Sequence, residues 1–142
     1  MRKNLILLTL LPTLVLSQEF FASWEVQIIP ECGISIAKQG RINIGQELGM
    51  SPVKFKPYNT IGNSTITLQS FDLINANTPH NSVWLGTSSN VAHSEPIQTW
   101  ANKPIEIGGN YEPLSVYAWL PDSANMNHGT VTLTATWEVN CY

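Results

Sequence analysis

The three histidines are the side chains of this 142-residue chain best suited to bind a metal or move a proton. His80, His93 and His128 each lie in a polar stretch between apolar segments. Zinc ligands form closer clusters or include a cysteine, and the spacing here provides neither. We interpret all three as surface histidines and expect no metal.

The carboxylates are just as scattered along the sequence. A glycosidase pair remains open at this level, but nothing in the sequence points to one. The chain has no Gly-x-Ser-x-Gly, His-Glu-x-x-His or phosphate-loop motif. We therefore expect neither enzyme activity nor a cofactor. The carboxylates considered are Glu47, Asp72, Glu95, Glu106, Glu112 and Asp122.

The two cysteines, Cys32 and Cys141, predict a disulfide. An even count is typical of disulfides in exported chains, whereas a nucleophilic Cys32 would need a partner histidine and a lowered pKa. The bridge would close a loop of about 110 residues and contribute up to roughly 4–5 kcal/mol by restricting the unfolded chain. Buried free thiols and an intermolecular bridge are the alternatives.

The first residues are typical of a secretory signal peptide. Arg2 and Lys3 precede the apolar run Leu5–Leu16, which is too short to span a membrane. We expect cleavage after Ser17, with Ala22 as a second candidate, and a short membrane anchor or buried helix as the alternative. Without residues 1–17, ten acidic side chains face five basic ones, which argues against binding to nucleic acid or anionic membranes.

The clearest structural pattern is the alternation of residues 129–142. One parity is apolar, and the other is mainly threonine, which predicts a half-buried β-strand. Residues 20–28 alternate in the same way. The apolar positions are Val131, Leu133, Ala135, Trp137 and Val139 in the later segment, and Phe20, Ala22, Trp24, Val26 and Ile28 in the earlier one.

Short strands separated by Gly, Pro and Asn turns fill the rest of the chain, which predicts an all-β sandwich or barrel. Further strands are expected at residues 34–36, 42–44, 53–56, 65–71, 83–85, 97–100, 104–107 and 114–120. Tyr117 and Trp119 have the opposite parity to Val116 and Ala118. They should therefore face outward, where they could stack on a sugar, fill an interface or be covered by a loop.

The ends of the chain resemble pilin subunits of the bacterial chaperone–usher pathway. The resemblance rests on the signal peptide and alternating segment, on Cys-Gly-Ile-Ser-Ile at residues 32–36, and on Ile-x-Ile-Gly at residues 42–45. It also rests on Gly129, fourteenth from the end, and on the aromatic Tyr142. The family places its tyrosine next to last, and its common disulfide joins two early strands, so the chain departs from the pattern at both points.

The resemblance implies an incomplete immunoglobulin-like β-sandwich at residues 32–142, preceded by an extension at residues 18–31. The apolar residues at 20–28 would be donated to a neighbouring subunit. Gly129, the apolar residues of 131–139 and Tyr142 would form the acceptor edge, which a chaperone also binds. The implied partners are a periplasmic chaperone, an usher and neighbouring pilins, with a host receptor or glycan in addition. The route would lead through the periplasm to a surface fimbria.

The alternative is a secreted immunoglobulin-like module that acts as a monomer and binds carbohydrate or protein. It would be closed by Cys32–Cys141. In that case residues 20–28 would pair within their own domain. The two interpretations differ in one structural question, which is where this segment forms its strand.

Overall fold

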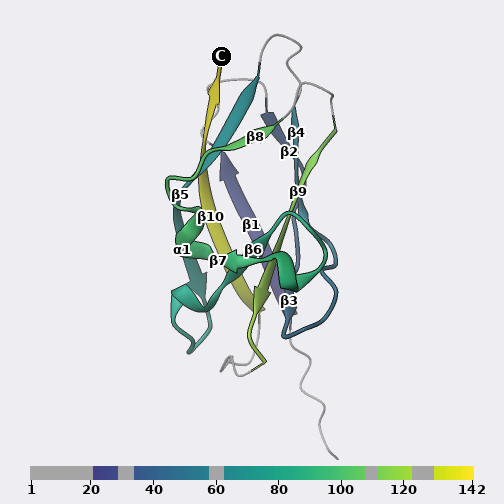
Figure 1. The fold of residues 1–142 in the computed structure, drawn as a ribbon. Helices are drawn as coiled ribbons and strands as arrows, with labels where there is room; N and C mark the ends of the chain where they lie inside the picture. The colour runs from purple at the N-terminus through teal and green to yellow at the C-terminus, as the bar shows by residue number, and fades with distance from the viewer. Residues whose placement is uncertain (1–20, 29–33, 58–62, 108–111, 123–129) are drawn as a thin grey trace, which may run out of the picture.

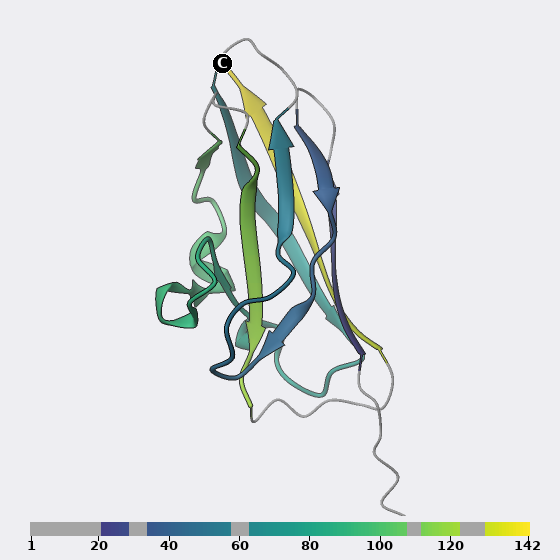
Figure 2. The same cartoon turned by 90° about the vertical axis from the view of Figure 1, so that its right-hand side faces the viewer.

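The computed structural model describes residues 21–28, 34–57, 63–107, 112–122 and 130–142. They form a β-sandwich of two facing sheets (Figures 1 and 2), which confirms the prediction of an all-β fold. The expected signal peptide, residues 1–17, lies outside the described residues and stays a prediction.

The first sheet joins the two alternating segments of the sequence. Its strands, in spatial order, are β1 (Phe21–Ile28), β10 (Thr130–Cys141), β5 (Ser64–Ile74) and β8 (Ile105–Ile107). β10 runs antiparallel to β5 on one side and parallel to β1 on the other. The long final strand thus lies inside the sheet, and β1 is its edge (Figure 1).

The second sheet is built around β9. Its strands, in order, are β2 (Ile34–Lys38), β4 (Val53–Pro57), β9 (Leu114–Leu120), β6 (Trp84–Gly86) and β7 (Glu95–Pro96), and β3 (Ile42–Ile44) pairs in parallel with β9. Two one-turn 3₁₀ helices, η1 (His80–Ser82) and η2 (Val91–His93), flank β6.

Alternation along β10 places its apolar side chains in the core between the sheets. All five, from Val131 to Val139, are at most 1% exposed, as predicted. Trp137 contacts Phe55 of β4 edge to face, with ring centroids 5.5 Å apart, and so joins the two sheets. Thr130 and Glu138 are exposed on the opposite face.

β5 changes the parity of its buried positions halfway along. Ile66 and Leu68 point inward as predicted, but further on Leu73 is the buried residue. Thr136 of β10 pairs with Ser70 and Trp137 pairs with Leu68, so no residue of β10 lies opposite Gln69 in the strand register. This β-bulge shifts the alternation by one residue. It allows β5 to continue as one strand to Ile74.

Residues 97–100 are not the strand that the sequence predicted. They form the single-turn helix α1 (Ile97–Trp100). Ile97 and Trp100 are both buried in the core, and Trp100 contacts Trp137 edge to face at 6.2 Å. Residues three apart share a face on a helix but lie on opposite faces of a strand. Only the helix can therefore bury both side chains.

Candidate functional site

The candidate site is the edge where β1 covers β10. The two strands align residue by residue, with Ala22 beside Val131, Trp24 beside Leu133 and Val26 beside Ala135. Trp24 is fully buried and Val26 is 5% exposed, whereas Ala22 is half-buried. The inward parity predicted for this segment is therefore confirmed at Trp24 and Val26, and the segment pairs within its own chain.

On its other side β1 is held by little more than a single bridge. The Trp24 amide donates to the Gly40 carbonyl at 3.0 Å, and the Gly40 amide donates back at 3.2 Å. A β-carbon at Gly40 would lie 2.8 Å from the Val53 nitrogen and 2.9 Å from the Ser51 oxygen. Only glycine allows this close approach of two backbones.

Not every polar side-chain group along this edge has a hydrogen-bond partner. Ser23 Oγ lies 3.2 Å from Thr132 Oγ1, within hydrogen-bond distance, on the outer face. The buried indole nitrogens of Trp24 and Trp137 have no hydrogen-bond partner among the described residues. A buried N–H without a partner costs about 1–3 kcal/mol. Burial of Trp24 thus combines a large apolar gain with a polar cost.

Several residues predicted for the donor and acceptor strands cannot be placed. Phe20 and Gly129 lie outside the described residues, and the side chain of Ile28 is not described. Tyr142 is described and is 67% exposed. Its amide donates to the Asn63 carbonyl at 3.0 Å, and the Asn63 amide donates back at 2.9 Å, so the end of β10 is tied to the start of β5.

The predicted disulfide is described at one end. Cys141 is half-buried in β10, with its Sγ 3.5 Å from Ser64 Oγ. Cys32 lies outside the described residues. The Cys32–Cys141 bridge therefore stays a prediction.

The prediction of an exposed aromatic pair is wrong for Trp119. Tyr117 is half-buried and Trp119 is 1% exposed, with their rings stacked 5.8 Å apart. Trp119 does have the opposite parity to the core residues of β9, but the loop after β3 covers it. Its Nε1 donates to the Glu47 carbonyl at 3.1 Å. Of the alternatives left open by the sequence, shielding by a loop is the one observed.

Trp84 is an exposed aromatic side chain on this face that was not predicted from the sequence. Trp84 of β6 is 42% exposed and lies directly opposite Trp119 in the antiparallel register. Both rings line a cleft of about 580 Å³. Trp84 went unnoticed because its three-residue strand is too short to show alternation.

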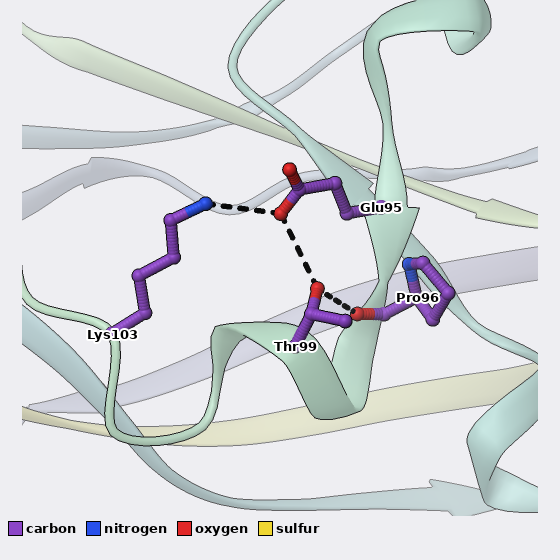
Figure 3. Close-up of polar contacts among 4 residues, drawn as sticks. All are labelled: Glu95, Pro96, Thr99 and Lys103. Atoms are coloured by element: carbon purple, nitrogen blue, oxygen red, sulfur yellow. Dashed lines mark hydrogen bonds and ion pairs between the residues drawn. The ribbon is translucent and has the colours of Figure 1, made fainter.

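Among the candidate carboxylates, Glu95 lies in a small exposed cluster of polar side chains. Glu95 accepts a hydrogen bond from Lys103 Nζ at 3.0 Å (Figure 3). Thr99 Oγ1 donates to the Pro96 carbonyl at 2.8 Å and lies 3.3 Å from the same Glu95 oxygen. The Lys103 hydrogen bond and charge lower the pKa of Glu95. These exposed contacts connect β7 with α1 and with the loop after α1, and exposed pairs of this kind contribute little to stability.

All three histidines were predicted to lie at the surface, and the structure describes the side chain of one of them, His93. His93 is exposed, the side chain of His80 is not described, and His128 lies outside the described residues. Across the described ranges, no three His, Cys, Asp or Glu side chains gather closely enough to bind a metal. None of the helices in these ranges is long and apolar enough to cross a membrane.

No family model and no curated protein matches the chain. The geometry of the β1–β10 edge is therefore the basis on which a function can be proposed.

Proposed function

We propose that the chain is a structural or adhesive subunit of a bacterial surface fimbria. In this proposal the sandwich is immunoglobulin-like, and subunits join by donating β1 to the β10 edge of a neighbour. The observation that carries the proposal is the way β1 completes the first sheet. Trp24 is fully buried there, and β1 pairs with β10 along all eight of its residues.

Removal of β1 would leave β10 as a long apolar edge strand. The backbone groups of Thr130 to Trp137 that face β1 would lose their partners, and Leu133 and Ala135 would lose their neighbours on β1. Edges of this kind recruit strands from other chains. The same chemistry suits β-augmentation, in which a donated strand supplies main-chain hydrogen bonds and alternate side chains fill the groove.

The direction of β1 makes it replaceable. It is parallel to β10, and parallel pairs are slightly less stable per residue than antiparallel ones. It also carries the buried Trp24 indole nitrogen, which has no described partner. The equivalent segment of a second chain, or a strand from a chaperone, could therefore compete for the same edge.

A secreted monomeric binding module is the second candidate, and one observation favours it. β1 occupies the β10 edge of its own chain, so the sandwich can close without a neighbour. In this case β1 would be a permanent strand. The two candidates thus differ in whether β1 exchanges.

The test is a chain that lacks residues 18–28, supplied with a peptide of the same residues. A fimbrial subunit predicts that the truncated chain is unstable alone and regains its near-ultraviolet circular dichroism when the peptide is added. A peptide carrying Trp24→Asp and Val26→Asp is the matched control and should fail. A truncated chain that folds unaided and ignores the peptide would refute the proposal.

A further inference from the structure

The cleft beside β6 and β9 lies on the outer face of the second sheet, away from the β1–β10 edge. Its volume of about 580 Å³ falls within the range of roughly 300–1,000 Å³ that is typical of small-ligand sites. The loop after β3, the η2 segment and the turn after β9 contribute its walls. The fimbrial proposal assigns no role to this cleft.

Two tryptophans of different exposure form one wall of the cleft. Trp84 and Trp119 are direct cross-strand partners and therefore share a face of the sheet. Trp119 is packed beneath the loop, with its indole N–H bonded to Glu47. Trp84 is 42% exposed, so part of its flat apolar ring system is open to solvent in the cleft. Such a surface fits the C–H face of a pyranose ring.

Polar side chains lie around this aromatic wall. The exposed Asp122 carboxylate can accept hydrogen bonds, and the exposed Gln46 amide can both donate and accept them. The described residues that line the cleft include no Lys, Arg or His. A cleft with a carboxylate and no cation disfavours phosphate, sulfate and acidic sugars. Hydroxyl groups on a neutral ring match both kinds of polar side chain.

Local hydrogen bonds fix the loop that carries Gln46. The Gly45 amide donates to the Leu120 carbonyl at 2.7 Å, and the Ile44 amide donates to Glu47 Oε1 at 2.7 Å. Gly45 has a φ of +61°, and a β-carbon there would collide with the Asp122 carboxylate. Because the loop is fixed before a ligand arrives, binding would cost little conformational entropy.

We propose that this cleft binds a neutral saccharide. Trp84 stacks on the sugar ring, and Asp122 and Gln46 bond to its hydroxyl groups. The inference does not depend on strand exchange, because β1 and β10 contribute no residue to the lining. A subunit that fails to exchange strands could still bind the sugar, and the reverse also holds.

The test is a titration of residues 18–142 with methyl pyranosides of glucose, galactose, mannose and N-acetylglucosamine. At least one sugar should shift the Trp84 and Trp119 indole resonances in a saturable way by NMR, and the Trp119 resonance reports on binding in the Trp84 variants. Trp84→Ala should weaken that binding about tenfold or more, a loss of roughly 1.4 kcal/mol. Trp84→Phe should retain part of it, and Asp122→Asn should weaken it about fivefold.

Ile74→Ala is the control, because Ile74 is 46% exposed on the first sheet and does not line the cleft. It should leave sugar binding unchanged. The proposal is overturned if no sugar shifts the Trp84 resonance at 20 mM, or if binding survives both Trp84→Ala and Asp122→Asn. Tighter binding of choline than of every sugar would also overturn it, because a carboxylate beside an aromatic ring can bind a quaternary ammonium group.

Discussion

The two sheets each bury a tryptophan, Trp24 or Trp119, but in different ways. On the first sheet, Trp24 belongs to β1, which is about 110 residues before its partner strand β10 in the sequence. Parallel pairing with β10 and one bridge to Gly40 hold it in place. On the second sheet, a loop covers Trp119 and is fixed by side chains within it or beside it. We infer that the first cover can exchange between chains, whereas the second is a fixed part of the domain.

The largest expected effect is at Trp24, because it is the fully buried side chain of β1. Trp24→Ala should lower the free energy of unfolding by about 3–5 kcal/mol, since it leaves a large cavity beside Leu133. Urea denaturation measures this change. Glu25→Ala, an exposed position on the same strand, should change it by less than about 0.5 kcal/mol. Similar losses at both positions would show that β1 does not fill the core.

The next effect tests the fixed cover of the second sheet. Asn43 is 1% exposed; its Nδ2 donates to the Ala118 carbonyl at 3.0 Å, and its Oδ1 accepts from the Met50 amide at 2.8 Å. Asn43→Ala should lower the free energy of unfolding by about 2–3 kcal/mol, because the Ala118 carbonyl and the Met50 amide lose this hydrogen-bond partner. Hydrogen exchange should also quicken at the Met50 amide. An unchanged exchange rate there would mean that Asn43 does not fix the loop.

A smaller effect is expected at Gly49, which lies against the stacked rings. A β-carbon there would be 2.6 Å from Tyr117 Cδ1 and 2.7 Å from Trp119 Cζ2. Gly49→Ala should therefore destabilise the domain by roughly 1–2 kcal/mol through overpacking. Gly86→Ala is the control, because its nearest contact, Trp119 Cζ3, would be 3.2 Å away. Thermal melts of the two variants should rank in that order, and the reverse order would argue against tight packing of the loop.

The smallest effect belongs to the exposed Glu95–Lys103 pair. Lys103 lowers the pKa of Glu95 in the folded state. The contribution of the ion pair to stability is therefore present above the unfolded-state pKa of Glu95 and is lost as the pH falls through its folded-state pKa. Lys103→Ala should raise the Glu95 pKa in an NMR titration and barely alter the melting temperature. Lys54→Ala should leave the Glu95 titration as it is. An unmoved Glu95 pKa in Lys103→Ala would show that the ion pair does not persist in solution.

The sequence predicted which face of each long strand is buried better than it predicted which strands pair with each other. Alternation identified Trp24, Val26 and Trp137 as inward, because residues two apart on a strand share a face. It contains no information on which strand lies alongside or in which direction. The parallel pairing of β1 with β10 was therefore visible only in the structure.

Short elements and distant cover explain the errors. Ile97–Trp100 is too short to reveal a helical period, and Gln69 gives no sign in the sequence of the bulge it forms. Parity correctly placed Trp119 on the outer face of β9. It could not show that a distant loop covers this side chain, as the hydrogen bond to Glu47, 72 residues earlier in the sequence, does. Burial there depends on tertiary packing rather than on local pattern.

The central claim is that β1 of one chain can complete the sheet of another. Native mass spectrometry of residues 18–142, refolded at increasing concentration, tests it most directly. We expect a ladder of oligomers that grows with concentration, shortens when a peptide of residues 18–28 is added, and is lost in Trp24→Asp. A chain that stays monomeric at every concentration and takes up no labelled peptide would contradict it, and β1 would then be a permanent strand of a closed sandwich.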